Sequence, residues 1–365
     1  MLKKSLLFLS INIFLNNYLF AMDINIADRG AKGDGEFDNW EIFQKAVDDI
    51  ANAGGGTLHI PKGTFAIYNK SLVIWGKDIT IKGDSALTTT LIKKGLVGYF
   101  GDAIDITGKA NGYQYFGQFG KGNYNTLQTY TGDNIPSENI QISSIHITSS
   151  ITSGSRNAQR GNNLGIINSR NITVSNCIIS SANQTNVAIV NELNRSKNGN
   201  IHFNNCEFSN SGTHNVRVIS YNQGNIVGNN VFIENSRFTN VRNTETLNKE
   251  ISGKNVHLWY RGAIDSNQTS LSVKNSYFDH TGVIIATQSA RNLNITNSTI
   301  DSTIEIKQSP KLTQLSRVTI ENNVFQRPKF KSNKIINDAN YQNISLYPHI
   351  LSNSPTVRIK NNQMK

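Results

Sequence analysis

One eight-residue phrase recurs eight times along this chain, and it constrains the fold more than any other feature of the sequence. The phrase reads apolar, any, apolar, any, asparagine, small or polar, any, apolar. Its copies lie at residues 172–179, 201–208, 231–238, 271–278, 293–300, 318–325 and 357–364, with an earlier copy at 140–147 in which Ser144 replaces the asparagine. Successive copies start 22 to 40 residues apart.

The alternation within each copy predicts a strand with one buried face. Steps of this length, with no long helical pattern between the copies, predict one coil of a solenoid per copy. The expected fold is therefore all-β, a right-handed parallel β-helix in which like residues stack on like. A β-sandwich is the alternative, but it would need hairpin turns such as Asn-Gly, which are scarce here.

Asparagine is unusually frequent, with 51 in 365 residues. Those of the phrase are expected to form a ladder at one bend of the coil, where asparagine tolerates turn conformations and its amide can satisfy backbone groups. The members of this ladder are Asn176, Asn205, Asn235, Asn275, Asn297, Asn322 and Asn361.

Residues 1–21 have the pattern of a secretory signal peptide: a basic start at Lys3 and Lys4, an apolar stretch, and a small residue, Ala21, at the expected cleavage site. An uncleaved anchor helix is the alternative. Because no other stretch approaches 18 consecutive apolar residues, we predict no membrane span in the mature chain, which should be secreted or periplasmic.

The mature chain, residues 22–365, is predicted to be a single β-helix domain. Residues 38–52 read as a short amphipathic helix that plugs the N-terminal end of the core, with Asp38 as its cap and Glu41 at the capping-box position. The predicted divisions are a cap and first coil at 22–67, an aromatic and glycine-rich loop at 97–137, regular coils at 138–325, a basic insertion at 326–352 and a last coil at 353–365.

The N-terminal residues resemble the entry motif of the pectate lyase superfamily, which rhamnogalacturonase-like and epimerase-like β-helix proteins and phage tailspikes share. The segments that carry this resemblance are Gly30–Gly35, Gln44–Ala46, Gly54–Thr57 and Pro61–Phe65. The resemblance covers about 40 residues closely. It implies the fold and a polysaccharide substrate but no particular reaction, and calcium is implied as a cofactor by the resemblance alone.

A second strand is predicted in each coil after the phrase, and alternation gives these strands an inward and an outward side. The inward residues are expected to be Val187, Val216, Val256, Val283 and Ile304. The outward column is expected to read Ala188, Arg217, His257, Ile284, Glu305, and the next one Val190, Ile219, Trp259, Ala286, Lys307. His214 and Lys254 share a column just before these strands.

Two neighbouring coils would then display four basic residues on one patch, our candidate catalytic residues His257, Lys254, Arg217 and His214. The candidate substrate-binding residues are Trp259, Tyr260, Arg261, Tyr221, Asp265 and Glu305. Rings beside cations suit a sugar acid, because the ring stacks on the sugar and the cation bonds the carboxylate. Crowding between Arg217 and Lys254 is expected to lower the pKa of His257, which favours a neutral base.

This pattern favours a lyase or C5-epimerase that acts on an acidic, uronate-containing glycan. A glycoside hydrolase is the enzyme alternative, but it needs two carboxylates flanking one bond, and Asp265, Asp279 and Glu305 do not share a column on adjacent coils. A non-catalytic glycan-binding or surface protein is the second alternative, with the patch an ordinary solvated sheet face. No carboxylate cluster that would support calcium is visible.

The formal net charge of +11 permits an acidic partner, and an acidic polysaccharide is the one we expect. No nucleic-acid-binding motif is present, so nucleic acid is not expected as a partner. Cys177 and Cys206 occupy the same phrase position in consecutive copies. They are either a disulfide between stacked strands or small core fillers, as Ser236 is in the next copy.

Overall fold

The computed structural model describes residues 21–68, 70–95, 102–107, 137–150, 161–167, 169–183, 185–192, 199–212, 214–222, 230–241, 254–262, 269–279, 283–287, 290–301, 303–306, 317–326, 344–346 and 357–364. The predicted signal peptide, apart from Ala21, lies outside these residues, as do the aromatic residues of the predicted loop. No helix among the described residues is long and apolar enough to cross a membrane.

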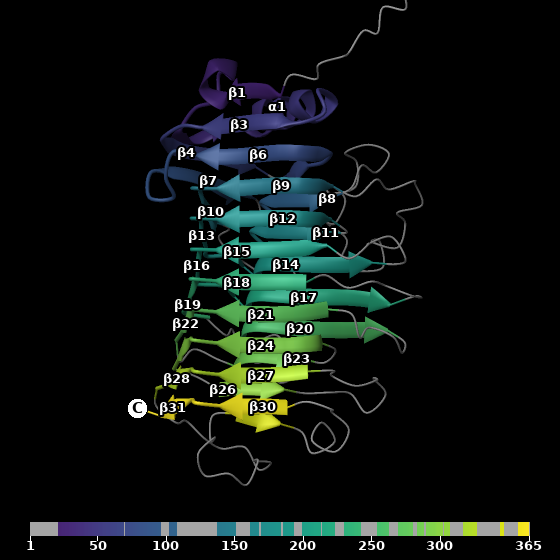
Figure 1. Ribbon diagram of the computed structural model, residues 1–365. Coiled ribbons are helices and arrows are strands. Elements are labelled where there is room, and N and C mark those ends of the chain that lie inside the picture. The colour runs from purple at the N-terminus through teal and green to yellow at the C-terminus, as the bar shows by residue number, and fades with distance from the viewer. Residues whose placement is uncertain are drawn as a thin grey trace, which may run out of the picture.

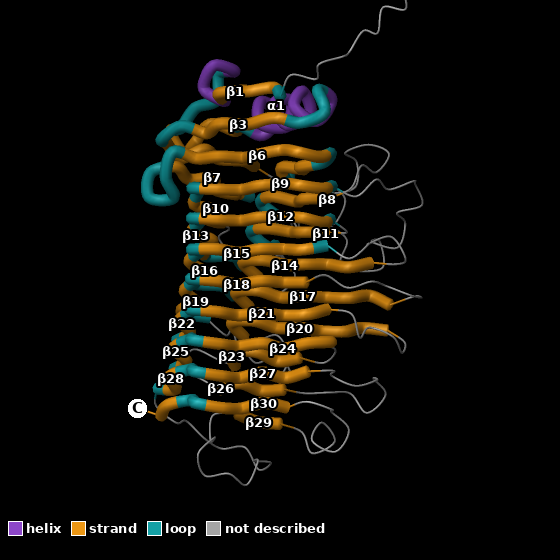
Figure 2. Tube along the Cα trace, viewed as in Figure 1, coloured by secondary structure: helices purple, strands orange, loops and turns teal. Residues whose placement is uncertain are grey.

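The described strands form three parallel sheets that wind around one core, as Figures 1 and 2 show. Sheet A contains β1 (Met22–Asn25), β3 (Gly56–Ile60), β6 (Lys77–Gly83), β9 (Glu138–Ser143), β12 (Arg170–Ser175), β15 (Asn200–Asn204), β18 (Asn230–Glu234), β21 (Thr269–Lys274), β24 (Ala290–Thr296), β27 (Arg317–Glu321) and β30 (Val357–Lys360). Sheet B contains β2 (Asp34–Asp38), β4 (Gly63–Tyr68), β7 (Thr89–Lys94), β10 (His146–Ser150), β13 (Ile178–Ser180), β16 (Glu207–Ser209), β19 (Arg237–Thr239), β22 (Tyr277–Phe278), β25 (Thr299–Ile300), β28 (Val324–Phe325) and β31 (Gln363–Met364). Sheet C contains β5 (Leu72–Ile74), β8 (Ile104–Thr107), β11 (Leu164–Ile167), β14 (Thr185–Glu192), β17 (His214–Asn222), β20 (Lys254–Gly262), β23 (Val283–Thr287), β26 (Thr303–Ile306) and β29 (Ile344–Leu346).

The chain passes from sheet A to sheet B to sheet C in each coil and then returns to sheet A, which confirms the predicted right-handed parallel β-helix. Each copy of the phrase covers two strands and the bend between them, not one strand as predicted. In the copy at 172–179, Ile172 and Val174 point inward from β12, Asn176 makes the bend, and Ile179 points inward from β13. The strand predicted to be the second of each coil is therefore the third, in sheet C.

The predicted asparagine ladder lies at the bend between sheets A and B. Its seven members all have left-handed backbone, with φ between 50° and 57°. The bend does not interrupt the backbone hydrogen bonds, because the N–H groups of the first six members donate to the next coil, as Asn176 N does to Asn204 O over 3.0 Å. The exposed amides bond one another: Asn205 Nδ2 donates to Asn176 Oδ1 over 2.8 Å. Asparagine suits the bend because it adopts the left-handed backbone conformation more readily than most residues. The predicted hydrogen bonds from the amides to the backbone are replaced by hydrogen bonds between amides.

A second ladder, which the sequence analysis did not predict, is buried at the corner between sheets B and C. Asn163 Nδ2 donates to Asn186 Oδ1 over 3.0 Å, and Asn186 Nδ2 donates to Asn215 Oδ1 over 2.8 Å. Asn186 also donates to the carbonyl of Ser209 over 2.8 Å. These fully buried amides satisfy one another and the corner backbone, as buried polar groups must.

The interior is filled by stacked apolar side chains. Phe208, Phe238 and Phe278 stack with ring centroids 4.7 and 4.6 Å apart. Cys177 and Cys206 are buried free thiols, so the core-filler interpretation is the correct one. The serine that follows in their column accepts a hydrogen bond instead, from Cys206 N to Ser236 Oγ over 3.2 Å.

The N-terminal end of the core is closed by α1 (Trp40–Asn52), after the short 3-10 helix η1 (Ile26–Arg29). The apolar stripe of α1 is buried, as predicted, but the helix begins after Asn39. Asp38 Oδ1 still accepts a hydrogen bond from Trp40 N over 3.1 Å. Gln44 pairs with the backbone of Val73, donating to its carbonyl and accepting from its N–H, both over 2.9 Å. The helix therefore provides hydrogen-bond partners for backbone groups of β5, the edge strand of sheet C.

Two of the predicted insertions contain sheet C strands. Within residues 97–137, Ile104–Thr107 form β8, and within 326–352, Ile344–Leu346 form β29. The coil pattern is thus continuous in sheet C where the sequence suggested a break.

We expect Asn235→Ala to lower the free energy of unfolding by about 1–2 kcal/mol, because alanine is strained at a left-handed bend. Asn235→Gly should cost only a few tenths of a kcal/mol, because glycine adopts this conformation freely. Urea unfolding followed by circular dichroism measures both changes. Asn200→Ala, on a strand of sheet A, is the control, and an equal loss in all three variants would contradict the conformational explanation.

Candidate functional site

Two columns of in-register residues run across sheet C. The 105 column contains Asp105, Gly165, Ala188, Arg217, His257, Ala286 and Glu305. The 102 column, three positions earlier in the strand direction, contains Asp102, Asn162, Thr185, His214 and Lys254. Successive members lie about 4.8 Å apart, which is the spacing of paired strands.

The register predicted for β17 and β20 is confirmed. Arg217 pairs with His257, and His214 pairs with Lys254. Further along the same strands, Ile219 pairs with Trp259, Ser220 with Tyr260, and Tyr221 with Arg261. The four basic residues chosen from the sequence therefore occupy adjacent positions on two neighbouring strands.

The register predicted for the next coil is wrong by two residues. Ala286, not Ile284, pairs with His257, and Ile285, not Val283, pairs with Val256. The pairing of β23 with β26 shifts between positions 283 and 285, an irregularity that alternation in the sequence cannot reveal. Glu305 is nevertheless in the 105 column, two strands beyond His257.

The structure describes the side chains of His214 and Arg217, and both are buried rather than displayed to solvent. Their exposed fractions are 1% and 9%. Only backbone positions are described for Tyr221, Glu305 and the chosen residues of β20, namely Lys254, His257, Trp259, Tyr260 and Arg261. Asp265 lies outside the described residues.

Two carboxyl groups that the sequence analysis missed meet at the other end of the same columns. A Cβ at position 165 would lie 2.4 Å from Oδ2 of Asp102 and 2.4 Å from Oδ1 of Asp105. The pair therefore needs glycine in the neighbouring strand. Asp102 is half-buried and is oriented by Asn162, whose backbone N and Nδ2 both donate to Oδ1 over 3.0 Å.

Asp105 is 1% exposed. Burial, followed by the charge of Asp102 and a hydrogen bond with it, raises the pKa of Asp105 well above its usual value. The raised pKa favours the protonated form of Asp105. The nearby hydroxyl of Ser71 acts in the opposite direction and lowers the pKa of Asp105. The Oγ atom of Ser71 nevertheless makes no hydrogen bond of normal geometry, and neither does the Oδ2 atom of Asp105.

Lys93, near the end of β7, is the third charged group at this corner. It is completely buried, and burial lowers its pKa to about 8, an effect that Asp102 and Asp105 partly offset. Lys93, with a pKa of about 8, can release or accept a proton near neutral pH, and it does so beside a carboxyl group whose pKa is raised. The sequence signal was the short alternation Ile104-Asp105-Ile106, which lies inside the predicted loop.

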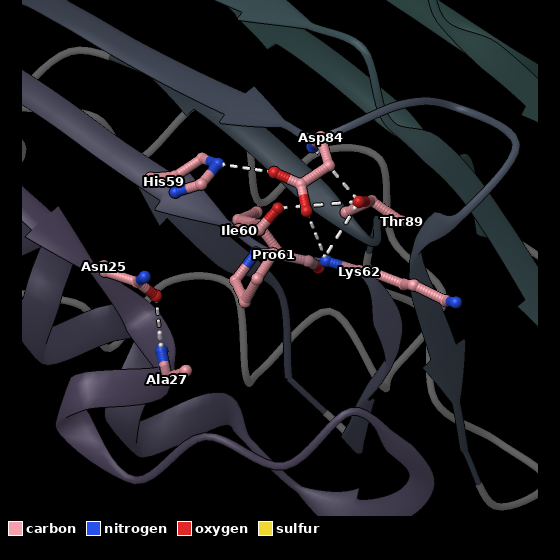
Figure 3. A network of polar contacts seen from close by, with 8 residues as sticks. All are labelled: Asn25, Ala27, His59, Ile60, Pro61, Lys62, Asp84 and Thr89. Atoms are coloured by element: carbon pink, nitrogen blue, oxygen red, sulfur yellow. Dashed lines mark hydrogen bonds and ion pairs between the residues drawn. The ribbon is translucent and has the colours of Figure 1, made fainter.

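A histidine–carboxylate pair on sheet A has a structural role instead. Figure 3 shows the ring of His59 facing the carboxylate of Asp84. His59 Nε2 lies 2.8 Å from Asp84 Oδ1, and Asp84 Oδ2 accepts a hydrogen bond from Lys62 N over 2.9 Å. The Lys62 N–H and then His59 lower the pKa of Asp84. Asp84 N donates to Thr89 Oγ1 over 3.2 Å, so the network links the start of β7 to the bend between β3 and β4.

Calcium, which the family resemblance implied, does not fit the carboxyl pair. The raised pKa of Asp105 favours its neutral form, and Lys93 lies close enough to interact with the charges of both carboxyl groups, so a cationic group is already present. Within the described ranges, no three His, Cys, Asp or Glu side chains are grouped closely enough to hold a metal. No step of the chemistry considered below therefore passes through calcium.

A comparison with protein families decides the relationship. The model described as rhamnogalacturonase A/epimerase, pectate lyase-like, matches residues 23–264. The chain belongs to this family. The match includes α1, both columns of sheet C as far as β20, and the carboxyl pair.

Individual relatives are similar over short segments only. Alginate lyase 7 of Azotobacter vinelandii is 44% identical over 46 residues, which are 13% of this chain and 5% of that protein. Mannuronan C5-epimerase AlgE3 of the same organism is 44% identical over 46 residues, which are 13% of this chain and 2% of that protein. The chain thus matches well under a tenth of the length of these relatives.

Among solved structures, the tailspike protein gp49 of Acinetobacter baumannii bacteriophage Fri1, a capsular polysaccharide depolymerase, is similar with a TM-score of 0.47 and 13% identity. The similarity covers 93% of this chain and 63% of that one. It is too distant to bear on function.

We expect Gly165→Ala to destabilise the protein by about 1–3 kcal/mol, because the added Cβ would overlap two carboxyl oxygens that cannot both move away. Urea unfolding measures the change. In the double variant Asp105→Ala/Gly165→Ala the two effects should be less than additive, since one of the overlapping oxygens is gone. Full additivity would show that the glycine serves another purpose.

We also expect the charged corner to give the stability a specific pH dependence. Lys93 loses its proton near pH 8 when folded but near 10.5 when unfolded, so the unfolded state binds more protons between these values. The free energy of unfolding should therefore gain up to about 1.4 kcal/mol per pH unit from this lysine as pH rises from 8 to 10. Asp105 acts oppositely: its raised pKa makes stability fall as pH rises from 3.8 toward the folded value.

Urea unfolding over a pH series tests both contributions. Lys93→Met should remove the rise above pH 8, and Asp105→Asn should remove the fall at acidic pH. Lys94→Met, at the neighbouring position where Glu36 raises the lysine pKa, is the matched control and should keep the rise. A rise that persists in Lys93→Met would contradict the assignment to Lys93.

Proposed function

We propose that this protein is a polysaccharide-active enzyme that removes the proton beside the carboxylate of a uronate sugar, as a lyase or a C5-epimerase. The observation that carries the proposal is the pairing of β17 with β20, which sets Arg217 beside His257 and His214 beside Lys254. The strand neighbours of Arg217 in its column are Ala188 and His257, neither of which is a carboxylate.

The chemistry assigns one task to each basic group. Arg217 bonds the substrate carboxylate and stabilises the negative charge that develops on it. Neutral His257 or Lys254 takes the proton from C5, and the C–H electron pair moves into the carboxylate as an enolate-like system. In elimination, that pair then forms the C4–C5 double bond as the C4–O bond breaks and the leaving oxygen gains a proton. In epimerisation, C5 regains a proton on its opposite face.

We propose His214 as a positioning residue, because at 1% exposed it is less accessible to a substrate than Arg217 at 9%. Trp259, Tyr260, Arg261 and Tyr221, on the same two strands, are proposed to hold the neighbouring sugars, together with Asp265 and Glu305. The rings would stack on sugar faces, and the cation would pair with a further carboxylate.

Family membership supports a glycan substrate, since the description of the family names rhamnogalacturonase, epimerase and pectate lyase. The short matches to proteins named alginate lyase and mannuronan C5-epimerase favour uronate chains. Such polymers lie outside cells, and the signal-peptide pattern of residues 1–21 supports secretion to the periplasm or beyond.

A second candidate is glycoside hydrolysis, which the Asp102–Asp105 pair favours. Hydrolases use one protonated and one ionised carboxyl group, and the raised pKa of Asp105 favours its protonated form beside Asp102. The two groups are in hydrogen-bonding contact, closer than the about 5 Å of a retaining enzyme, so they would have to separate to admit a substrate.

Purified protein incubated with alginate and polygalacturonate tests the proposal. Elimination is measured by the ultraviolet absorbance of the unsaturated product, and epimerisation by deuterium entry at C5. We expect the double change His257→Ala/Lys254→Ala to abolish turnover. Arg217→Ala should lower kcat/KM by about 10²–10³-fold, and Arg217→Lys by less, because lysine keeps the charge but loses the paired hydrogen bonds.

Arg237→Ala, on sheet B, removes the same charge elsewhere and should leave turnover unchanged. New reducing ends without absorbance, lost in Asp105→Asn but not in Arg217→Ala, would replace the proposal with hydrolysis. Turnover that survives the double change would show that the base lies elsewhere. Binding of either polymer without any product would favour a non-catalytic glycan-binding protein.

A further inference from the structure

The solvent side of sheet A carries an unusual strip of uncharged residues. These six are in register on consecutive strands from β9 to β24: Gln141, Thr173, His202, Phe232, Ser272 and Asn294. All are partly or fully exposed. At about 4.8 Å per strand, the strip extends about 24 Å along the axis of the β-helix.

An aromatic pair occupies the middle of the strip. The rings of His202 and Phe232 stack with centroids 4.4 Å apart and planes 12° apart. Both rings keep a solvent-facing part, which is notable for phenylalanine on a sheet whose other outward positions are polar or charged. The pair offers a flat apolar face of the kind on which a sugar ring stacks.

The two columns that flank the strip differ in charge. On one side, amides and hydroxyls bond across strands, such as Asn230 Nδ2 to Asn200 Oδ1 over 3.1 Å and Asn292 Nδ2 to Ser270 Oγ over 3.1 Å. On the other side the column holds two opposite charges, Glu234 next to Lys274, and its remaining positions are uncharged: Ser143, Ser175, Asn204 and Thr296. The strip therefore presents hydrogen-bonding groups and one apolar face but no net charge.

We propose that this strip is a second glycan-binding surface, which holds an extended polysaccharide chain along the axis of the β-helix. The choice of a polysaccharide as the ligand rests on the proposed function. Sheet A faces away from sheet C across the core, so the strip is separate from the columns of the candidate catalytic site (Figure 1).

The uncharged composition determines how the chain is recognised. A sugar polymer presents hydroxyl groups along its length and an apolar ring face, and the strip offers two amides, two hydroxyls and two rings. One strand step is comparable with the length of one sugar ring, so successive sugars meet successive strands. The carboxylates of a uronate chain would point away from the strip, whereas Arg217 is proposed to bind them in the catalytic site.

The experiment measures binding and turnover separately. Affinity electrophoresis in gels that contain alginate, polygalacturonate or a neutral β-glucan gives the Kd for each polymer. We expect at least one polymer to retard the protein and Phe232→Ala to raise that Kd about tenfold, as loss of a central aromatic contact does. Ser272→Asp, which adds a charge without removing apolar packing, should weaken binding similarly. Turnover of a tetrasaccharide, too short to reach both sites, should not change.

Leu87→Ala is the matched control, because Leu87 is 85% exposed on a turn away from the strip and its loss should not affect binding. Circular dichroism shows whether each variant is folded. The strip is overturned if no polymer retards the protein, or if Phe232→Ala and Ser272→Asp both bind as the original chain does. If these variants lose binding but the protein turns over no glycan, the proposed function is overturned, whereas the glycan-binding role of the strip is supported.

Discussion

Unbroken hydrogen bonding from coil to coil is the constraint on which this structure depends. Every coil must pair with the next in three sheets and also through the bend between sheets A and B. A left-handed residue at the bend makes this possible, since the N–H of Asn176 and of its equivalents still reaches the next coil. Once each coil copies the register of the one before it, side chains stack in columns, and packing of the interior follows, as in the Phe208–Phe238–Phe278 stack.

The same constraint arranges the chemistry of the outer faces. Because the register is fixed, a charged residue on one strand has a defined neighbour 4.8 Å away on the next. The 105 column thus carries a carboxyl group at one end, small residues at Gly165 and Ala188, and the basic pair Arg217 and His257 beyond them. Loops between coils can vary in length with little effect on this order, since the cost of closing a loop rises slowly with its length.

Much of the fold followed from local pattern. The repeat predicted parallel strands and an asparagine ladder at one bend, and alternation in the strands that follow it predicted the register of β17 with β20, because each depends on a pattern within a few residues. Two failures have physical causes. Alternation carries no information about the shifted pairing at β23, and the four-residue strand β8 is too short to stand out beside a glycine- and tyrosine-rich stretch. The approach of Lys93 to Asp102 and Asp105 brings the end of β7 in sheet B close to β8 in sheet C, at a corner that only packing defines.

By itself the sequence determined that this chain is a parallel β-helix with an N-terminal capping helix, and that basic residues of two coils lie side by side. Those properties depend on short sequence patterns, so they can be predicted from the order of the residues. The tertiary structure decided which outward residues are buried, where the carboxyl pair forms and that an uncharged strip runs along sheet A. Each of these features depends on contacts between residues of several coils or sheets. The length of the intervening loops does not reveal which residues come into contact.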